Sequence, residues 1–225
     1  MIAAAGAGFR YGKLKQLELL NGRRVIDWSV STAKSVADGV VVVLPSGVAA
    51  EIGASLGVDR VVVGGATRTA SVRAGIEAVP ADATVIVVHD AARPLASREL
   101  FERVIEVLEG DSVYGTRTSA MTEQAIDGVV PGVEVPDTLK RVDRSSSKVM
   151  AVLETVDRDG LLAVQTPQAF VASVLRRAHS FGRDTSDDAG LVEAAGGNIV
   201  VVPGEAVNVK ITLPEDLNRL STVVQ

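Results

Sequence analysis

The 225-residue chain is predicted to adopt an α/β fold with a mostly parallel sheet, on three observations. Short apolar runs alternate with helical patterns from the N-terminus to about residue 110. These runs are continuous and rich in valine, which is typical of parallel strands buried on both faces. Apolar residues make up 47% of the chain, which is ample for helices packed on both faces of such a sheet.

The first half of the chain is expected to form four strand–helix units. Apolar residues at helical spacing predict a helix over Arg24–Ala37, and a β-branched run ended by a proline predicts a strand over Gly39–Leu44. A helix over Arg98–Leu108 has Ser97 as its N-cap and Gly110 as its stop. The other predicted elements are strands at Met1–Ala5, Asp59–Gly64 and Thr84–Val88, and helices at Ala49–Leu56 and Thr69–Ala78.

The pattern changes after residue 110. Short strands are predicted at Val129–Val135, Leu139–Val142 and Lys148–Glu154, separated by prolines and a triple-serine turn. We expect the segment at about 129–164 to form a β-arm that leaves the main sheet, after an insertion at about 112–125. The chain is predicted to continue as a single domain, 1–225, with helices at Ala172–His179 and Asp187–Ala195, strands at Asn198–Val202 and Asn208–Ile211, and a helix from Glu215.

The composition excludes several classes of function. A net charge of −5 and 3% aromatic residues argue against nucleic-acid binding, which uses basic patches and stacking platforms. Without cysteine the chain has no disulfide, catalytic thiolate or cysteine-based zinc site, which fits a cytoplasmic protein. No apolar run approaches the roughly 18 residues of a membrane span.

A glycine-rich stretch follows the first predicted strand. It contains Gly6 and Gly8, with the cations Arg10 and Lys15 close behind. A Walker P-loop fails at two required positions, and a dinucleotide fingerprint fails in its spacing and lacks the acid that ends the second strand. Two interpretations stay open: a plain strand–helix turn, and a nucleotidyltransferase loop whose cations hold a nucleoside triphosphate. The cations favour the second, because glycine backbone and positive charge together bind phosphates.

A second candidate group stands at the end of the predicted strand Thr84–Val88. Ligands bind at the carboxyl ends of strands in open parallel sheets, so Asp90 is placed to hold a divalent metal bound to phosphates. The alternative is that Asp90 only caps a helix. Arg93 favours the functional interpretation, whereas His89 is expected to have a structural, hydrogen-bonding role.

Two further motifs are weaker when taken alone. The run Gly64–Ser71 either reads a base edge through its backbone or starts a helix with Thr67 or Thr69 as its cap. Lys210 lies between apolar residues in a predicted strand, and a bound phosphate would supply the partner that such a lysine needs. The acids of Thr185–Ala189 are most simply a helix N-cap and first turn.

Taken in order, these motifs resemble the 2-C-methyl-D-erythritol 4-phosphate cytidylyltransferase family of the non-mevalonate isoprenoid pathway. The matching pieces span nearly the whole chain and are Ala4–Arg10, Lys15-Gln16, Gly64-Gly65 with Arg68 and Ser71, His89–Pro94, Asp137–Lys140, Val156–Arg158, Gln165–Gln168, Thr185–Ala189 and Asn208–Thr212. The resemblance implies a Rossmann-like nucleotidyltransferase fold, with a protruding β-arm that clasps a second subunit to form a homodimer.

The resemblance also implies a role for each candidate residue. Those expected to bind CTP are Ala4, Ala5, Gly6 and Gly8 in the loop, and Gly65, Ala66 and Ser71 near the cytosine and ribose. Those expected to be catalytic are Arg10, Lys15, Lys210 and Asp90, the last as the ligand of Mg²⁺. Those expected to bind the acceptor, a sugar-alcohol phosphate, are Arg158 and Thr166, with Arg93 and Thr138 reaching across from the partner subunit.

The implied reaction joins 2-C-methyl-D-erythritol 4-phosphate to CTP and releases pyrophosphate. The acceptor phosphate, with a second pKa of about 6, is largely ionised at neutral pH and needs no general base. Two alternatives stay open: a ribitol 5-phosphate cytidylyltransferase, which shares the nucleotide half, and a non-catalytic nucleotide-binding module. Small side chains at Ala91 and Ala92 favour the methyl-bearing acceptor over ribitol phosphate, because they leave room for the methyl group.

Overall fold

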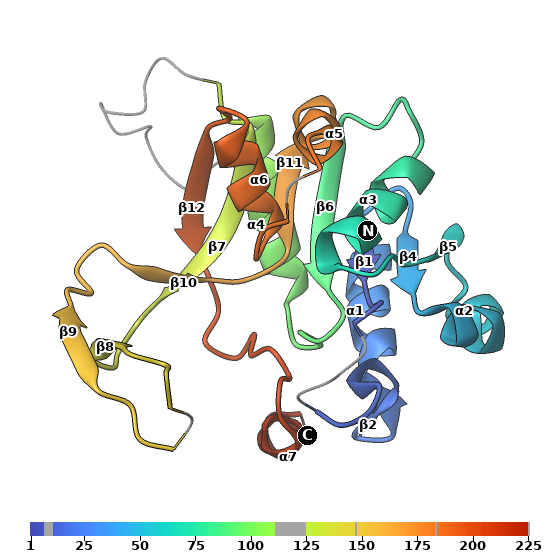
Figure 1. Ribbon diagram of the computed structural model, residues 1–225. Helices are drawn as coiled ribbons and strands as arrows, with labels where there is room; N and C mark the ends of the chain where they lie inside the picture. Colours follow the sequence, from blue (N-terminus) through green and yellow to red (C-terminus); the bar gives the residue numbers. More distant parts are fainter. Residues whose placement is uncertain (7–10, 111–124, 147, 183, 225) are drawn as a thin grey trace.

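The computed structural model describes residues 1–6, 11–110, 125–146, 148–182 and 184–224, and its centre is an eight-stranded sheet (Figure 1). The strand order is β10-β7-β11-β6-β1-β4-β5, and β12 pairs with β7. The strands are β1 (Ile2–Ala3), β4 (Val41–Leu44), β5 (Arg60–Val63), β6 (Val85–Asp90), β7 (Gly128–Glu134), β10 (Leu162–Val164), β11 (Gln168–Val171) and β12 (Ile199–Pro203).

The sheet is parallel over the half that the sequence predicted best. The strands β6, β1, β4 and β5 are parallel neighbours, and β12 is parallel to β7. The strand β11 inserts antiparallel between β6 and β7, and β10 is antiparallel to β7. The predicted α/β class with a mostly parallel sheet is therefore confirmed.

Helices cover both faces of the sheet because strand side chains alternate between the two faces. In β6, Ile86 and Val88 pack with α3 (Arg68–Ala78), α5 (Ala172–Ser180) and α6 (Asp188–Ala194). Val87 points the other way, toward the cores under α1 (Val25–Lys34), α2 (Ser46–Ile52) and α4 (Arg98–Glu109). The result is a three-layer arrangement whose strand ends remain open to form a site.

Three helices begin at the caps that the sequence predicted. Ser97 Oγ accepts a hydrogen bond from Leu100 N at the start of α4, at 3.0 Å. Thr67, not Thr69, caps α3, and Asp187 caps α6. Gly110 ends α4 with a φ of +83°, a left-handed conformation that glycine adopts without strain.

The structure differs from the sequence prediction in the length and type of several elements. The strand β6 extends through His89 and Asp90, which were expected to follow it, because β1 continues to pair with it as far as Ala3–Asp90. The segment Asn208–Ile211 is not a strand: it pairs with no neighbouring strand of the described chain. The strands β10 and β11 were not predicted as strands of the main sheet. The first lies at the end of the segment assigned to the arm, and the second is only four residues long and runs directly into α5.

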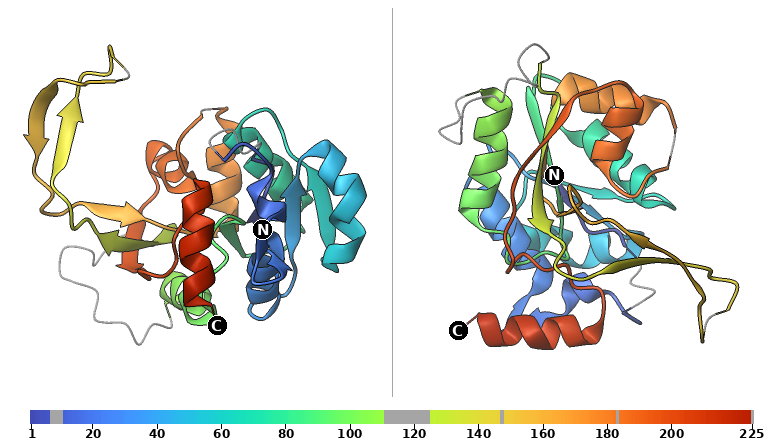
Figure 2. Two further views of the ribbon diagram at one scale, coloured as in Figure 1. Left: turned by 90° about the horizontal axis from the view of Figure 1, so that it is seen from below. Right: turned by 90° about the vertical axis from the view of Figure 1, so that its left-hand side faces the viewer.

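The β-arm is shorter than predicted. Its strands β8 (Leu139–Val142) and β9 (Val152–Val156) form a two-stranded sheet that projects from the body of the molecule (Figure 2). The ends of the predicted arm, 129–164, instead belong to the main sheet as β7 and β10, so the prediction is wrong for those ends. The third predicted strand also begins later than Lys148. Apart from Ala125, the predicted insertion at 112–125 lies outside the described residues.

A small hydrophobic cluster packs residues from the N-terminal part of the chain against the C-terminal helix. The turn η1 (Lys15–Leu17) and the hairpin β2 (Leu19–Leu20) and β3 (Arg23–Arg24) lead from the glycine-rich stretch into α1, and η2 (Gly53–Leu56) extends α2. The C-terminal helix α7 (Pro214–Val223) contacts β2, and the buried side chains of this cluster are Tyr11, Leu20, Val25, Ile211 and Leu220. None of the described helices has the length and apolar character of a membrane span.

Candidate active site

A cavity of about 480 Å³ lies at the carboxyl ends of β1 and β6. Four segments that are far apart in the sequence meet around it. The lining residues are Ala3–Gly6, Tyr11, Lys15, Gln16, Gly65–Arg68, Ser71, Asp90–Ala92, Lys210 and Thr212. The position agrees with the rule that open α/β sheets bind ligands beyond their strand ends.

The loop after β1 is held from below by Gln16. This side chain is buried, and its Nε2 donates to Ala4 O at 2.8 Å and to Gly6 O at 3.4 Å. A Cβ on Gly64 would lie 2.3 Å from Ala5 Cβ, so only glycine lets the second loop pack directly on the first. The two loops therefore form one wall of the cavity, built mainly of backbone.

The wall formed by Gly65 and Ala66 is fixed by Ser71. The Ser71 hydroxyl accepts a hydrogen bond from Gly65 N at 3.1 Å and lies 2.9 Å from Thr67 O, to which it can donate. A Cβ on Gly65 would meet Ala70 Cβ at 2.6 Å. Ser71 therefore lines the cavity, and its hydroxyl also holds the Gly65–Thr67 turn in place.

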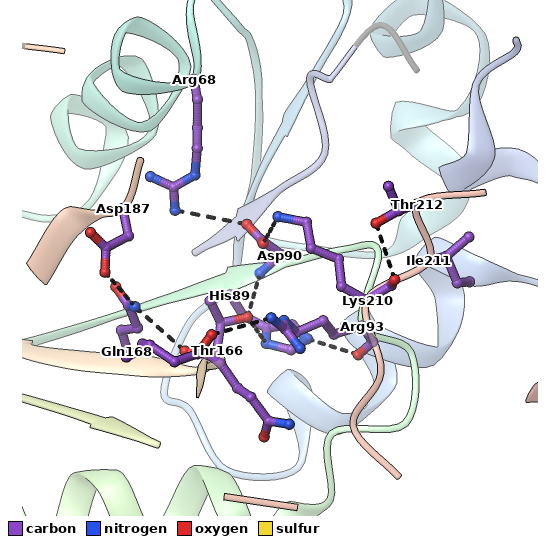
Figure 3. A network of polar contacts seen from close by, with 12 residues as sticks. Arg68, His89, Asp90, Arg93, Thr166, Gln168, Asp187, Lys210, Ile211 and Thr212 are labelled. Atoms are coloured by element: carbon purple, nitrogen blue, oxygen red, sulfur yellow. Dashed lines mark hydrogen bonds and ion pairs between the residues drawn. The ribbon is translucent and has the colours of Figure 1, made fainter. Parts of the chain in front are cut away.

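Three charged side chains meet at the centre of the cavity. Lys210 Nζ donates to Asp90 Oδ2 at 2.6 Å, and Arg68 Nη2 lies 3.8 Å from Asp90 Oδ1, from the other side (Figure 3). Burial by itself would raise the pKa of Asp90, but the nearby Lys210 and Arg68 outweigh it and lower the pKa to about 2. Asp90 is therefore an ionised carboxylate at any physiological pH.

A buried hydrogen-bond chain positions the backbone of Asp90. Asp90 N donates to Thr166 Oγ1 at 3.0 Å, so the Thr166 hydroxyl is left to donate to His89 Nδ1, also at 3.0 Å. The other ring nitrogen of His89 then carries the proton and donates to Arg93 O at 3.1 Å. Burial lowers the pKa of His89 to about 4, which agrees with this neutral tautomer. The expected structural role of His89 is confirmed.

The segment that carries Lys210 has no regular secondary structure and is held by side chains. Arg93 Nη1 donates to Asn208 O at 2.7 Å, and the buried Asn208 side chain donates to Thr166 O at 2.9 Å. Lys15 Nζ donates to Ile211 O at 2.5 Å. These contacts across the chain, and not a strand, bring Lys210 to Asp90.

The structure brings most of the predicted site residues together. The nine that line the cavity are Ala4, Ala5, Gly6, Lys15, Gly65, Ala66, Ser71, Asp90 and Lys210. Four do not line it. Arg93 and Thr166 lie in the hydrogen-bond network beside it, whereas Thr138 and Arg158 flank the arm, where Arg158 donates to Val135 O and Pro136 O. Gly8 and Arg10 lie outside the described residues.

Sequence reasoning missed Arg68 as a site residue. The motif that begins at Gly64 included it but assigned it no role, and its partner Asp188 was interpreted as a helix-cap acid. Arg68 lines the cavity and pairs with Asp188 Oδ2 at 2.8 Å across 120 residues of sequence. No local pattern predicts such a pair. Tyr11, Thr67 and Thr212 also line the cavity, and the sequence analysis gave them no part in ligand binding.

The fit of a divalent cation depends on Asp90. The described residues contain no group of three histidine, aspartate or glutamate side chains that could hold a metal. A single ionised carboxylate is still a suitable ligand, since Mg²⁺ keeps several waters and is commonly bound by one or two carboxylates together with substrate phosphates. The site therefore fits a cation that arrives with a phosphorylated ligand.

The arrangement suits the binding of phosphates better than proton transfer. The cations Lys15, Arg68 and Lys210 border a cavity that is otherwise lined largely by glycine and alanine residues of the two loops. Both nitrogens of His89 are engaged, and its low pKa makes it a poor base at neutral pH. Such a site acts through position and positive charge.

The chain matches the family model described as 2-C-methyl-D-erythritol 4-phosphate cytidylyltransferase over residues 1–225. It is 38% identical over 231 residues to a protein of that name from Nocardia farcinica, covering 100% of this chain and 92% of the other. It is also 38% identical over 237 residues to the bifunctional enzyme IspD/IspF of Clavibacter michiganensis. The chain spans about half of that longer protein, with 100% of this chain matched against 53% of the relative.

The fold is also similar to solved structures. The crystal structure of 2-C-methyl-D-erythritol 4-phosphate cytidylyltransferase from Thermus thermophilus superposes with a TM-score of 0.79 at 35% identity, covering 99% of this chain and 96% of the other. The crystal structure of 4-diphosphocytidyl-2C-methyl-D-erythritol synthase from Anaerococcus prevotii gives the same TM-score at 27% identity, over 100% and 96% of the two chains. The family model, the relatives and the solved structures therefore all point to the same family.

Proposed function

The chain belongs to the 2-C-methyl-D-erythritol 4-phosphate cytidylyltransferase family, and on that premise we propose that it transfers the cytidylyl group of CTP to 2-C-methyl-D-erythritol 4-phosphate. The products are 4-diphosphocytidyl-2-C-methyl-D-erythritol and pyrophosphate, in the synthesis of isoprenoid precursors. The observation that carries the proposal is the convergence of Lys15, Asp90 and Lys210 on one cavity beside the glycine-rich loop.

The reaction is a displacement at phosphorus. A phosphate oxygen of the acceptor attacks the α-phosphorus of CTP and forms a new P–O bond, while the bond from that phosphorus to the β-phosphate oxygen breaks and pyrophosphate leaves with the electron pair. The attacking oxygen is largely ionised near neutral pH, so no base is needed to remove a proton. The obstacle is repulsion between two anions, which positive side chains relieve.

Each cation has a place in this scheme. Lys15, close to the loop after β1, would hold the phosphates of CTP together with Arg10. Lys210, on the opposite side near Arg93 and the end of β6, would hold the acceptor phosphate close to the reacting phosphorus. The Gly64–Ser71 turn would receive the cytosine and ribose, since its close packing leaves backbone groups and small side chains against the cavity.

Asp90 would hold a divalent cation, Mg²⁺ in our proposal, together with phosphate oxygens of CTP. When bound, such an ion neutralises phosphate charge and stabilises the charge that develops at the α-phosphate. The low pKa of Asp90 supports this role, because the carboxylate is ionised whenever the nucleotide arrives. Lys210 and Arg68 would keep it ionised in the absence of a cation.

The arm is proposed to bind a second copy of the chain. Val149, Val152 and Leu153 expose 82%, 59% and 62% of their surface, and a two-stranded hairpin is marginal in water by itself. In a twofold dimer the partner would cover these side chains, and the arm would carry Thr138 toward the partner's acceptor site. Sedimentation should give a dimer at micromolar concentration. A fully active monomer would contradict the proposal.

The experiment that tests the function is pyrophosphate release with CTP, ATP, GTP or UTP, and with 2-C-methyl-D-erythritol 4-phosphate or ribitol 5-phosphate as acceptor. We expect release that depends on CTP, the methylerythritol acceptor and Mg²⁺ together. A preference for ribitol phosphate would retain cytidylyl transfer but change the acceptor. Tight CTP binding without release under any condition would indicate a non-catalytic binding module.

A further inference from the structure

Arg68 lies between the carboxylates of Asp188 and Asp90, which differ in how deeply they are buried. Its Nη2 is 2.8 Å from Asp188 Oδ2, within hydrogen-bond distance, and 3.8 Å from Asp90 Oδ1, beyond it. Asp188 is fully buried behind the cavity wall, whereas Asp90 lines the cavity. The guanidinium is therefore hydrogen-bonded to the carboxylate that no ligand can reach, and it only approaches the one that a ligand would use.

Asp188 is held in place from its other side. His179 Nε2 lies 3.0 Å from Asp188 Oδ1, and both side chains are almost completely buried. Among the described residues, each oxygen of the Asp188 carboxylate thus has one partner, His179 or Arg68. A buried carboxylate needs such partners, because an unpaired charge in the interior is costly. The pairing fixes Arg68 on the Asp188 side.

The consequence appears at Asp90. Its Oδ2 accepts from Lys210 at 2.6 Å, but no described residue donates a hydrogen bond to Oδ1. The positive charge of Arg68 is near enough to favour the ionised carboxylate, yet its donors are directed elsewhere. Arg68 Nη1 forms no hydrogen bond within the described part of the chain, so the guanidinium retains donors that could reach Asp90 if it turned.

We propose that Asp188, oriented by His179, anchors Arg68 so that the guanidinium supports the charge of Asp90 without occupying Oδ1, which stays available to a divalent cation bound to the nucleotide. Asp188, His179 and Arg68 are then positioning residues that act through Asp90. This rests on the proposed function, since the cation is the one that arrives with CTP. Two cations then act on Asp90: Lys210 is hydrogen-bonded to it, and Arg68 is held at a distance by Asp188.

The test compares two variants, of which only the first should weaken the response to Mg²⁺. In Asp188→Asn the anchor loses its charge, so Arg68 should turn onto Asp90 Oδ1 and compete with the cation. In calorimetric titrations of CTP, the Mg²⁺ concentration that gives half-maximal binding should rise about tenfold. In Arg68→Gln the competing charge is removed, so that concentration should stay at the parent value or fall. The double variant should behave like Arg68→Gln.

Asp187→Ser is the matched control. Asp187 is the adjacent acid, and its carboxylate caps α6 by accepting from Gly190 N, a role that serine performs well. The substitution removes one negative charge from the same turn without releasing Arg68, so the Mg²⁺ dependence should not change. Thermal melting of each variant shows that it is folded. If Asp188→Asn does not fold, the Mg²⁺ dependence of CTP binding by Arg68→Gln still tests the proposal.

Three results would overturn the proposal. The first is an unchanged Mg²⁺ dependence in a folded Asp188→Asn variant. The second is weaker CTP binding by Arg68→Gln at every Mg²⁺ concentration, which would make Arg68 a direct ligand of the nucleotide. The third is a nucleotide-free crystal structure of Asp188→Asn in which Arg68 remains beyond hydrogen-bond distance of Asp90. This last result needs no CTP, so it tests the anchor even if the proposed function fails.

Discussion

The two sides of the cavity are built in different ways. The side formed by the loop after β1 and the Gly64–Ser71 turn consists of short contiguous motifs, held by glycine contacts and by hydrogen bonds from Gln16 and Ser71. The side that carries Lys210 consists of residues separated by tens of positions, joined by Arg93, Asn208 and Thr166. The first side depends on backbone shape, and the second on buried side-chain hydrogen bonds.

This difference indicates where each side is vulnerable. On the first side, a substitution disturbs the site when it adds atoms to a close backbone contact. On the second side, a substitution disturbs the site when it removes a hydrogen bond from a segment that has no strand or helix to hold it. Substitutions on the first side should therefore mainly weaken the binding of CTP, and substitutions on the second side the binding of the acceptor.

The largest effect is expected from removing the cation on each side. Lys15→Ala and Lys210→Ala should each lower kcat on the order of 10²-fold or more, as for the loss of one preorganised charge-stabilising donor. Lys210→Ala should also raise the KM for the acceptor. Lys15→Ala should raise the KM for CTP and, to a lesser extent, that for the acceptor, because Lys15 Nζ donates to Ile211 O in the Lys210 segment. Steady-state kinetics with each substrate varied measure both. Near-normal turnover in either variant would remove that lysine from the site.

The next effect concerns the pH dependence of stability. The pKa of His89 is about 4 in the folded protein against 6.5 ordinarily, so between these values the unfolded chain binds more protons. Stability should therefore fall as the pH falls through this window, by about 1.5 kcal/mol between pH 6.5 and 5 for this group alone.

The measurement is urea unfolding at pH 6.5 and pH 5 for the parent and for His89→Gln. The glutamine variant should be less stable at pH 6.5 but should lose less stability on acidification. Other titrating groups contribute equally to both proteins and cancel in the difference. Equal losses in the two proteins would show that His89 is not the group that titrates. Asp90 should not contribute here, since its pKa is lowered to about 2.

A smaller effect is expected from the network that holds the Lys210 segment. Asn208→Ala removes the hydrogen bonds to Thr166 O and Gln165 Oε1, the second at 3.2 Å, from a fully buried side chain. The KM for the acceptor should rise about tenfold, the equivalent of one such hydrogen bond, while the KM for CTP changes little. An equal loss for both substrates would mean that the two sides are not independent.

The smallest effect is expected at Ala92, which is buried at the edge of the cavity. A valine there would fill part of the space for the methyl group of the acceptor. The ratio of kcat/KM for 2-C-methyl-D-erythritol 4-phosphate to kcat/KM for ribitol 5-phosphate should narrow by roughly 1 kcal/mol, the low end of what one methyl-sized contact contributes to discrimination. A wider preference in Ala92→Val would exclude contact between this residue and the methyl group.

The sequence by itself determined the parallel strands β1, β4, β5 and β6 and the nucleotide side of the site. Valine runs, glycine turns and caps such as Ser97 and Thr67 act over a few residues, so their consequences can be predicted locally. The glycines follow the same logic because they stand just after strands, and Lys15 follows the glycine-rich stretch. The family resemblance then supplied roles that local patterns left open.

Only the tertiary structure decided the rest. The strand β11 was not predicted, because its four residues show little pattern of their own and it inserts between β6 and β7, which lie far away in the sequence. Lys210 was assigned to a strand that does not exist, and Arg68 was left without a role, because their partners Asp90 and Asp188 are each 120 residues away. Such contacts arise when the chain closes long loops around a common core, and nothing in the neighbouring sequence indicates which ends will meet.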